Sequence, residues 1–308
     1  MKFKDITHKI FPKAGTAPKG SGLFASVDDL VAQRRYAHEW QLGRLNHYTS
    51  QQAGDVKSAF KGRGMEFEEI RAYTFGDDVR DIDWRVTARK QQPYTKLYNE
   101  EKDREVYVLL DFSQTMAFGT RKELKSVTAA KIAARIGWQC LKNKDRFGCV
   151  IHAFPQDLLF KAQHSLSNMM LIFQKMEEAS RGLLEQKASE SSLKNTLYLL
   201  QTAIKSRAIV FVISDFADFS DEIRKILAML AKKADVTCVN VFDCLEQKAP
   251  IPGEYMVQDG EKRLVFSSAN KVFRKEYETY FAQKHQQLRD FCRQFHLHYL
   301  EEITGNCH

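Results

Sequence analysis

The feature that most constrains this chain is a short apolar run that ends in oxygen-bearing side chains. The run from Val106 to Leu110 is apolar on both faces, which is typical of a central parallel strand covered by helices. Asp111, Ser113 and Thr115 follow at alternating positions. Ligands of open α/β sheets bind at the carboxyl ends of strands, and Mg²⁺ prefers oxygen ligands. Either Asp111 and Ser113 cap the next helix, or the three residues hold a cation.

A second strand-like run ends in the same way. Ala208 to Ser214 is followed by Asp215. In a doubly wound sheet the first strand lies beside the strand that begins the second half, so Asp111 and Asp215 are expected to face one crevice. Two neighbouring carboxylates repel, which raises one pKa or recruits a metal. The pair favours the metal interpretation over the helix cap.

Strand-like and helix-like patterns alternate from residue 104 onward. We expect strands at 106–111, 146–153, 157–161, 208–213, 235–242 and 296–300, helices at 121–142, 166–178, 193–205, 220–232 and 270–294, a loop at 180–192, and a hairpin at 254–266 that turns at Asp259-Gly260. The alternation predicts an α/β fold with a doubly wound, mostly parallel sheet and helices on both faces. The strands 146–153 and 157–161, joined through Pro155, should form an antiparallel edge.

The chain is expected to have three parts. Residues 1–25 are predicted to be a flexible tail, 26–103 an N-terminal segment, and 104–308 the main domain. Within 26–103, a helix should begin at the capping residue Ser26 and end near Leu42, and strands are expected at 66–73 and 94–98.

Composition narrows the function classes. The net charge of +8 permits nucleic acid as a partner, but residues 1–104 and 105–308 each carry four excess basic residues, so the charge does not favour it. Six cysteines without a C-x-x-C pair are typical of a reduced, cytoplasmic protein. We expect neither a signal peptide nor a membrane span, because no apolar run is long enough.

The motifs of common enzymes are missing from the sequence. It contains no G-x-x-x-x-G-K-[ST], no H-E-x-x-H and no G-x-S-x-G. We therefore expect a binding protein rather than an enzyme. Two alternatives stay open: a metal-dependent phosphoester hydrolase at the same crevice, which needs a positioned base or a second metal, and a nucleic-acid binder.

The spacing of Asp111, Ser113 and Thr115 resembles the metal-ion-dependent adhesion site of von Willebrand factor A domains. The resemblance implies that Asp215 and a loop hydroxyl complete the site. Counting back from the helix L-K-N-T-L-Y-L-L puts Ser191 at the loop position, after Glu190 in place of the usual Gly. This departure implies weak binding of Mg²⁺ or Mn²⁺.

A second resemblance covers the segment before the main domain. Ten positions fit an R-x-Y-x-x-G-D-x-x-R-x-I-x-W-x-x-[ST]-A-R pattern, namely Arg71, Tyr73, Gly76, Asp77, Arg80, Ile82, Trp84, Thr87, Ala88 and Arg89. The pattern resembles the signature of the domain-of-unknown-function 58 family. In their gene neighbourhood, members of this family resemble proteins that are encoded beside MoxR-type AAA+ ATPases. The resemblance therefore implies an adaptor that acts with such an ATPase in the assembly or maturation of other proteins.

The same block also has a purely structural interpretation. Arginine–carboxylate pairs can lock a segment onto a domain, Gly76 permits a tight turn, and Trp84 could serve as an apolar anchor. Either a structural clamp or a docking surface for a partner would use these residues.

Overall fold

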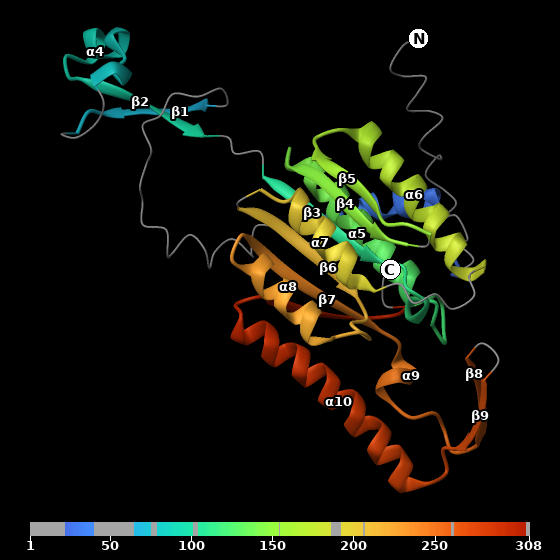
Figure 1. Ribbon diagram of the computed structural model, residues 1–308. Helices are drawn as coiled ribbons and strands as arrows, with labels where there is room; N and C mark the ends of the chain where they lie inside the picture. The colour runs from blue at the N-terminus through green and yellow to red at the C-terminus, as the bar shows by residue number, and fades with distance from the viewer. Residues whose placement is uncertain are drawn as a thin grey trace, which may run out of the picture. The chain divides into compact units, whose positions relative to one another are not determined.

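The computed structural model describes residues 22–39, 65–74, 79–100, 104–153, 155–185, 192–205, 207–259 and 262–305 (Figure 1). The chain divides into two compact units. The larger unit comprises Met1–Trp40 with Arg104–His308, and the smaller unit comprises Gln41–Asp103. The predicted division differs, because it grouped residues 26–40 with the segment that forms the smaller unit.

A six-stranded sheet forms the centre of the larger unit. Its strands are β3 (Glu105–Asp111), β4 (Arg146–His152), β5 (Leu158–Gln163), β6 (Ala208–Ser214), β7 (Ala234–Phe242) and β10 (His298–Ile303). The order across the sheet is β10-β7-β6-β3-β4-β5, and β5 alone among these six runs antiparallel to its neighbour. Numbered within the sheet this is 3-2-1-4-5-6, the doubly wound order. The predicted fold and antiparallel edge are confirmed.

Helices cover both faces of this sheet, which explains why its central strands are apolar throughout. They are α5 (Lys125–Lys142), α6 (Leu166–Glu185), α7 (Leu193–Ala203), α8 (Asp221–Ala231) and α10 (Lys271–Gln294). Buried residues of α7, α8 and α10 share one apolar cluster with the sheet, whereas α5 packs with α6 and with the helix α2 (Val27–Ala32) (Figure 1). Every residue of β6 is buried. No helix in the described ranges is long and apolar enough to cross a membrane.

The N-terminal helix belongs to the larger unit because its backbone is bonded to α5 and α6. Trp138 Nε1 donates to the Leu30 carbonyl at 3.1 Å, and Val27 N donates to Glu177 at 2.8 Å. After α2 the chain tightens into the 3₁₀ helix η1 (Gln33–Glu39). Of the predicted tail, residues 1–21 lie outside the described residues, and Ala25 is fully buried. The tail prediction is therefore wrong for Ala25.

Several element boundaries differ from the sequence prediction. Helix α6 continues to Glu185, so the loop expected from Ser180 is helical at its start. A short helix, α9 (Cys244–Gln247), was not predicted. The 3₁₀ turn η3 (Gln114–Met116) precedes α5, which begins at Lys125. The expected hairpin is present as β8 (Glu254–Asp259) and β9 (Lys262–Ser267), while its turn residue Gly260 lies outside the described residues.

The smaller unit contains an antiparallel pair, β1 (Met65–Ala72) and β2 (Tyr94–Glu100). Both strands were predicted. Between them lie the 3₁₀ turn η2 (Val79–Asp81) and the helix α4 (Trp84–Lys90), which was missed. Helix α4 begins where Asp83 caps it, since Asp83 Oδ1 accepts from the backbone N–H groups of Arg85 and Val86 at 3.0 and 3.2 Å.

Candidate functional site

The carboxyl ends of β3 and β6 bring the two predicted carboxylates to one edge of the sheet. The strands pair in parallel up to Leu110 and Ile213. Asp111 is only 3% exposed, and its Oδ2 accepts from Ser214 Oγ at 2.6 Å while its Oδ1 accepts from Ser113 N at 2.8 Å. Asp215 comes directly after Ser214 and raises the pKa of Asp111 through its charge. Asp111 and Asp215 therefore lie at the carboxyl ends of two neighbouring parallel strands.

Two hydroxyl groups stand beside Asp111 in the turn that follows β3. Ser113 Oγ and Thr115 Oγ1 are 3.1 Å apart. Adjacent oxygen ligands of an octahedral Mg²⁺, each at about 2.0–2.1 Å from the ion, lie about 3 Å from one another. The spacing of the hydroxyls therefore fits two neighbouring ligands of such an ion. Thr115 is exposed and Ser113 is half-buried, so solvent or a partner can reach them.

The electrostatics of Asp111 also suit a cation. Burial raises the pKa of Asp111, and the negative charge of Asp215 raises it further. His152 and the hydrogen bonds from Ser214 and Ser113 act in the opposite direction without cancelling the rise. A bound cation would relieve both unfavourable effects, because it neutralises the carboxylate pair.

A lysine that the sequence analysis did not single out occupies the other side of Asp215. Lys125, the first residue of α5, is 2% exposed, and its Nζ lies 2.7 Å from Asp215 Oδ2 and 2.8 Å from Glu246 Oε1. Burial by itself would lower the pKa of Lys125, but the two carboxylates outweigh burial and raise it. Asp215 Oδ1 accepts from Ala217 N at 3.0 Å, so both of its oxygens are engaged.

Glu246 reaches Lys125 because α9 is held in place by its capping residue. Asp243 and Glu246 form a capping box at the start of α9. Asp243 is fully buried and also accepts from Thr120 Oγ1 and Thr304 Oγ1, each at 2.5 Å. The D-x-x-E spacing was the available sequence signal for this helix start, and no comparable signal marks Lys125 as a partner of Glu246.

The predicted metal ligands divide into three groups when they are compared with a divalent ion. Asp111, Ser113 and Thr115 fit, by their spacing and by the uncompensated charge. Asp215 is already bonded to an ammonium group. Ser191 lies outside the described residues. Within the described ranges no group of three or more His, Cys, Asp or Glu side chains is arranged to hold a metal ion, so a cation here would depend on hydroxyl oxygens and water.

The signature block lies in the smaller unit, with Gly76 and Asp77 outside the described residues. Trp84, the first residue of α4, is 67% exposed, so it is no apolar anchor within its own unit. Arg80 and Arg89 are also exposed, whereas Tyr73 and Arg71 are half-buried and Arg71 Nη1 donates to Thr74 Oγ1 at 2.6 Å. The exposed face of the block leaves a docking role open.

The sheet order, its antiparallel edge and the Asp-x-Ser-x-Thr turn after its first strand define a domain of von Willebrand factor A type. The chain belongs to the family described as "Protein of unknown function DUF58", whose model matches residues 69–287. That range includes all ten positions of the signature block and both strand-end carboxylates, so the family predicted from the sequence is confirmed.

The chain is similar to a mycobacterial protein and to two solved structures. "Uncharacterized protein Mb1516" of Mycobacterium bovis is 28% identical over 218 residues, which cover 69% of this chain and 66% of that protein. The crystal structure of BatB from Bacteroides thetaiotaomicron is similar at 16% identity and a TM-score of 0.41, covering 66% of this chain and 92% of BatB. The crystal structure of the SpRpn10 VWA domain is similar at 10% identity and a TM-score of 0.37, covering 66% of this chain and 89% of that domain.

Proposed function

We propose that this protein is a protein-interaction module that binds a carboxylate of its partner at the edge formed by Asp111, Ser113 and Thr115. The family and the fold suggest an interaction module. The observation that carries the specific site is the pairing of a buried carboxylate with two hydroxyls 3.1 Å apart, beside a second carboxylate. This arrangement suits Mg²⁺ or Mn²⁺, which would supply positive charge and an open ligand position.

The charges of the ionisable side chains at this edge support weak binding of that cation. Asp111, Asp215 and Glu246 bring three negative charges when ionised, and Lys125 brings one positive charge. The remaining two negative charges match one divalent ion. Because the Lys125 ammonium competes for Asp215, Asp111 and the hydroxyls would hold the ion largely without it. The exposed Thr115 gives a partner access to the same place.

We further propose that the partner is a MoxR-type AAA+ ATPase and that the two act in the cytoplasm on other protein clients. The ATPase follows from the family resemblance of the signature block. Trp84, 67% exposed on α4, offers a second contact surface for it, since exposed tryptophans are common binding anchors.

Binding is favoured over phosphoester hydrolysis by the state of the nearest histidine. His152 acts electrostatically on Asp111, yet it is 2% exposed. Its Nδ1 lies 2.8 Å from Asp157 Oδ1 and 2.7 Å from Thr196 Oγ1. A general base must reach the proton that it removes, and this buried, hydrogen-bonded ring does not face a substrate.

The test is co-purification with the AAA+ ATPase encoded nearest to this gene, in Mg²⁺ or in EDTA. Wild type should retain the ATPase in Mg²⁺, and Asp111→Ala should lose it. Asp218→Ala, which removes an exposed carboxylate after β6, is the matched control and should behave as wild type. Equal retention by Asp111→Ala would refute the site, and phosphoester turnover that Asp111→Ala abolishes would favour the hydrolase.

A further inference from the structure

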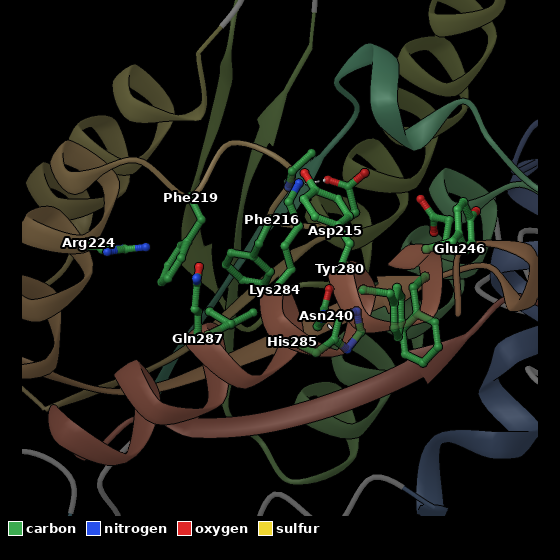
Figure 2. Close-up of a pocket in the computed structure, with 15 residues that line it drawn as sticks. Asp215, Phe216, Phe219, Arg224, Asn240, Glu246, Tyr280, Lys284, His285 and Gln287 are labelled. Atoms are coloured by element: carbon green, nitrogen blue, oxygen red, sulfur yellow. Dashed lines mark hydrogen bonds between the residues drawn. The ribbon is translucent and has the colours of Figure 1, made fainter. Parts of the chain in front are cut away.

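A cavity of about 350 Å³ opens beside Asp215, between the ends of β6 and β7 and the helix α10 (Figure 2). This volume lies at the small end of the range of ligand pockets, about 300–1,000 Å³. Six aromatic side chains line the cavity, namely Phe216, Phe219, Phe242, Tyr277, Tyr280 and Phe281. Such a lining suits a flat apolar group.

One lining residue, Asn240, holds a buried hydrogen-bond acceptor without a partner among the described residues. Asn240 is 2% exposed, and its Nδ2 lies 3.1 Å from Tyr299 Oη. Tyr299 donates its single proton to Glu301 Oε1 at 2.8 Å, so its oxygen must accept from Asn240. This chain of bonds fixes the orientation of the amide. Asn240 Oδ1 then has no hydrogen-bond partner among the described residues.

A buried acceptor without a partner is unfavourable, and a ligand that donates a hydrogen bond removes that cost. Tyr299 is not part of the cavity lining, whereas Asn240 is. Asn240 Nδ2 lies near Tyr299 Oη and also 3.3 Å from Nε2 of the lining residue His285, so Oδ1 is the atom of the amide that lacks a partner among the described residues. The preferred occupant is therefore a flat apolar group that carries one N–H or O–H donor.

Two cationic side chains, Lys284 and Arg224, line the cavity and lie close to its aromatic rings. Asp215 and Glu246 line it but are both bonded to Lys125. Lys284 Nζ lies 5.0 Å from the centre of the Tyr280 ring and makes no ion pair with any described carboxylate. Arg224 lies over Phe219 and, among the described residues, forms an ion pair only with the exposed Asp221, at 3.4 Å. Acidic groups beside the aromatic group would complement these two cations.

We propose that this cavity binds a tryptophan or tyrosine side chain of a partner protein, in a segment with acidic neighbours. The proposal rests on the interaction module proposed above and extends its site. Asp215 belongs both to the cavity lining and to the predicted cation site, so one partner segment can place its aromatic side chain in the cavity and a carboxylate at the edge. Tyrosine and tryptophan combine a large apolar surface with a donor group.

The experiment uses three blocked peptides with the full chain, each with the sequence Asp-Asp-X-Asp-Asp. X is tryptophan, its isostere 3-benzothienylalanine, which lacks the N–H donor, or alanine. Binding is measured by chemical-shift changes of the ¹⁵N-labelled protein. The tryptophan peptide should bind with a Kd on the order of 1 mM. The benzothienyl peptide should bind about five- to tenfold more weakly, and the alanine peptide not at all.

Two variants in which an exposed alanine is replaced by tryptophan locate the binding site. Ala217 is exposed and lines the cavity, so the side chain introduced by Ala217→Trp should fill the cavity. The Kd of the tryptophan peptide should then rise at least about tenfold. Ala269→Trp, at an exposed alanine outside the lining, is the matched control and should bind as wild type. The proposal is overturned if the tryptophan and alanine peptides bind with equal affinity. It is also overturned if the Ala217→Trp protein has an unchanged melting temperature and still binds the tryptophan peptide as wild type does.

The same peptides separate this proposal from the proposed function. Asp111→Ala and EDTA should leave the affinity ratio of the tryptophan and benzothienyl peptides unchanged, because the cavity contacts do not involve Asp111. Capture of the ATPase without any preference for the tryptophan peptide overturns the cavity proposal alone. If the protein clearly prefers the tryptophan peptide and Asp111→Ala does not change capture of the ATPase, the cavity proposal is supported and the cation site is refuted.

Discussion

Replacing Lys125 with methionine tests the central electrostatic arrangement of this molecule. Methionine keeps an unbranched apolar stem but removes the ammonium that bridges Asp215 and Glu246 at 2.7 and 2.8 Å. The Asp215 side chain is 7% exposed and that of Glu246 is 32% exposed. Breaking a buried ion pair costs about 3–5 kcal/mol, and the partial exposure of Glu246 places this case near about 3 kcal/mol.

The expected loss is measurable by thermal unfolding. For a domain of this size, about 3 kcal/mol corresponds to a fall in Tm of roughly 6–12 °C. Lys175→Met is the matched control, because its ion pair with Glu178 lies on the surface, with side chains 37% and 62% exposed. Such surface pairs contribute little, so this control should melt close to wild type.

Magnesium should partly restore the Lys125→Met variant. Without the ammonium, Asp215 becomes available to a divalent ion together with Asp111. An ion at ten times its Kd stabilises the folded state by about 1.4 kcal/mol. Wild type should gain less at the same Mg²⁺ concentration, since Lys125 occupies Asp215. A Lys125→Met protein that melts like wild type would refute the buried bridge. Equal stabilisation of both proteins by Mg²⁺ would refute the competition.

Three further predictions concern Asp111, Trp84 and Asp243. Asp111→Asn should raise Tm in EDTA more at pH 8 than at pH 4: the pKa of Asp111 is raised in the folded state, so its contribution to stability is lost as the pH rises through that value. A pH-independent difference would contradict this. Trp84→Ala should change the free energy of unfolding by only about 0.5 kcal/mol, since Trp84 is 67% exposed, while weakening capture of the ATPase. A large fall in Tm with normal capture would restore the clamp interpretation. Asp243→Ala should lower Tm at pH 7 and lose this effect at low pH: burial raises the pKa of Asp243, but hydrogen bonds, chiefly from Thr120 and Thr304, outweigh burial and lower it. A defect that persists below pH 3 would point to packing instead.

The fold could be predicted because its strongest signals are local. Strands β3 and β6 each contain a continuous apolar run, with Asp111 at the end of β3 and Asp215 directly after β6, and the doubly wound rule then places those ends side by side. Helix α4 was missed because its residues are mostly exposed and show no apolar period, so only the Asp83 cap marks its start. The packing of α2 on the larger unit depends on Trp138 and Glu177, more than a hundred residues away.

The candidate site was predictable only in its first half. Asp111, Ser113 and Thr115 form one motif, and Asp215 follows from topology. Lys125 and Glu246 lie 121 residues apart and meet only through tertiary structure. A lysine at the start of an apolar helix gives no sign of burial, because lysines are usually solvent-exposed. The sequence therefore could not identify Lys125, the residue that neutralises part of the negative charge at the candidate site.

This bridge changes what the edge of the sheet can recognise. The three carboxylates of Asp111, Asp215 and Glu246 alone would repel an acidic partner, whereas the ammonium of Lys125 already cancels one negative charge and a divalent ion would cancel the other two. With the ion bound the edge is neutral, and the cationic side chains of Lys284 and Arg224 line the cavity beside it. An acidic segment is then attracted where the empty edge would reject it. Thermodynamic linkage is reciprocal. Such a partner would therefore raise the affinity of the protein for the ion by the same factor by which the ion raises its affinity for the partner.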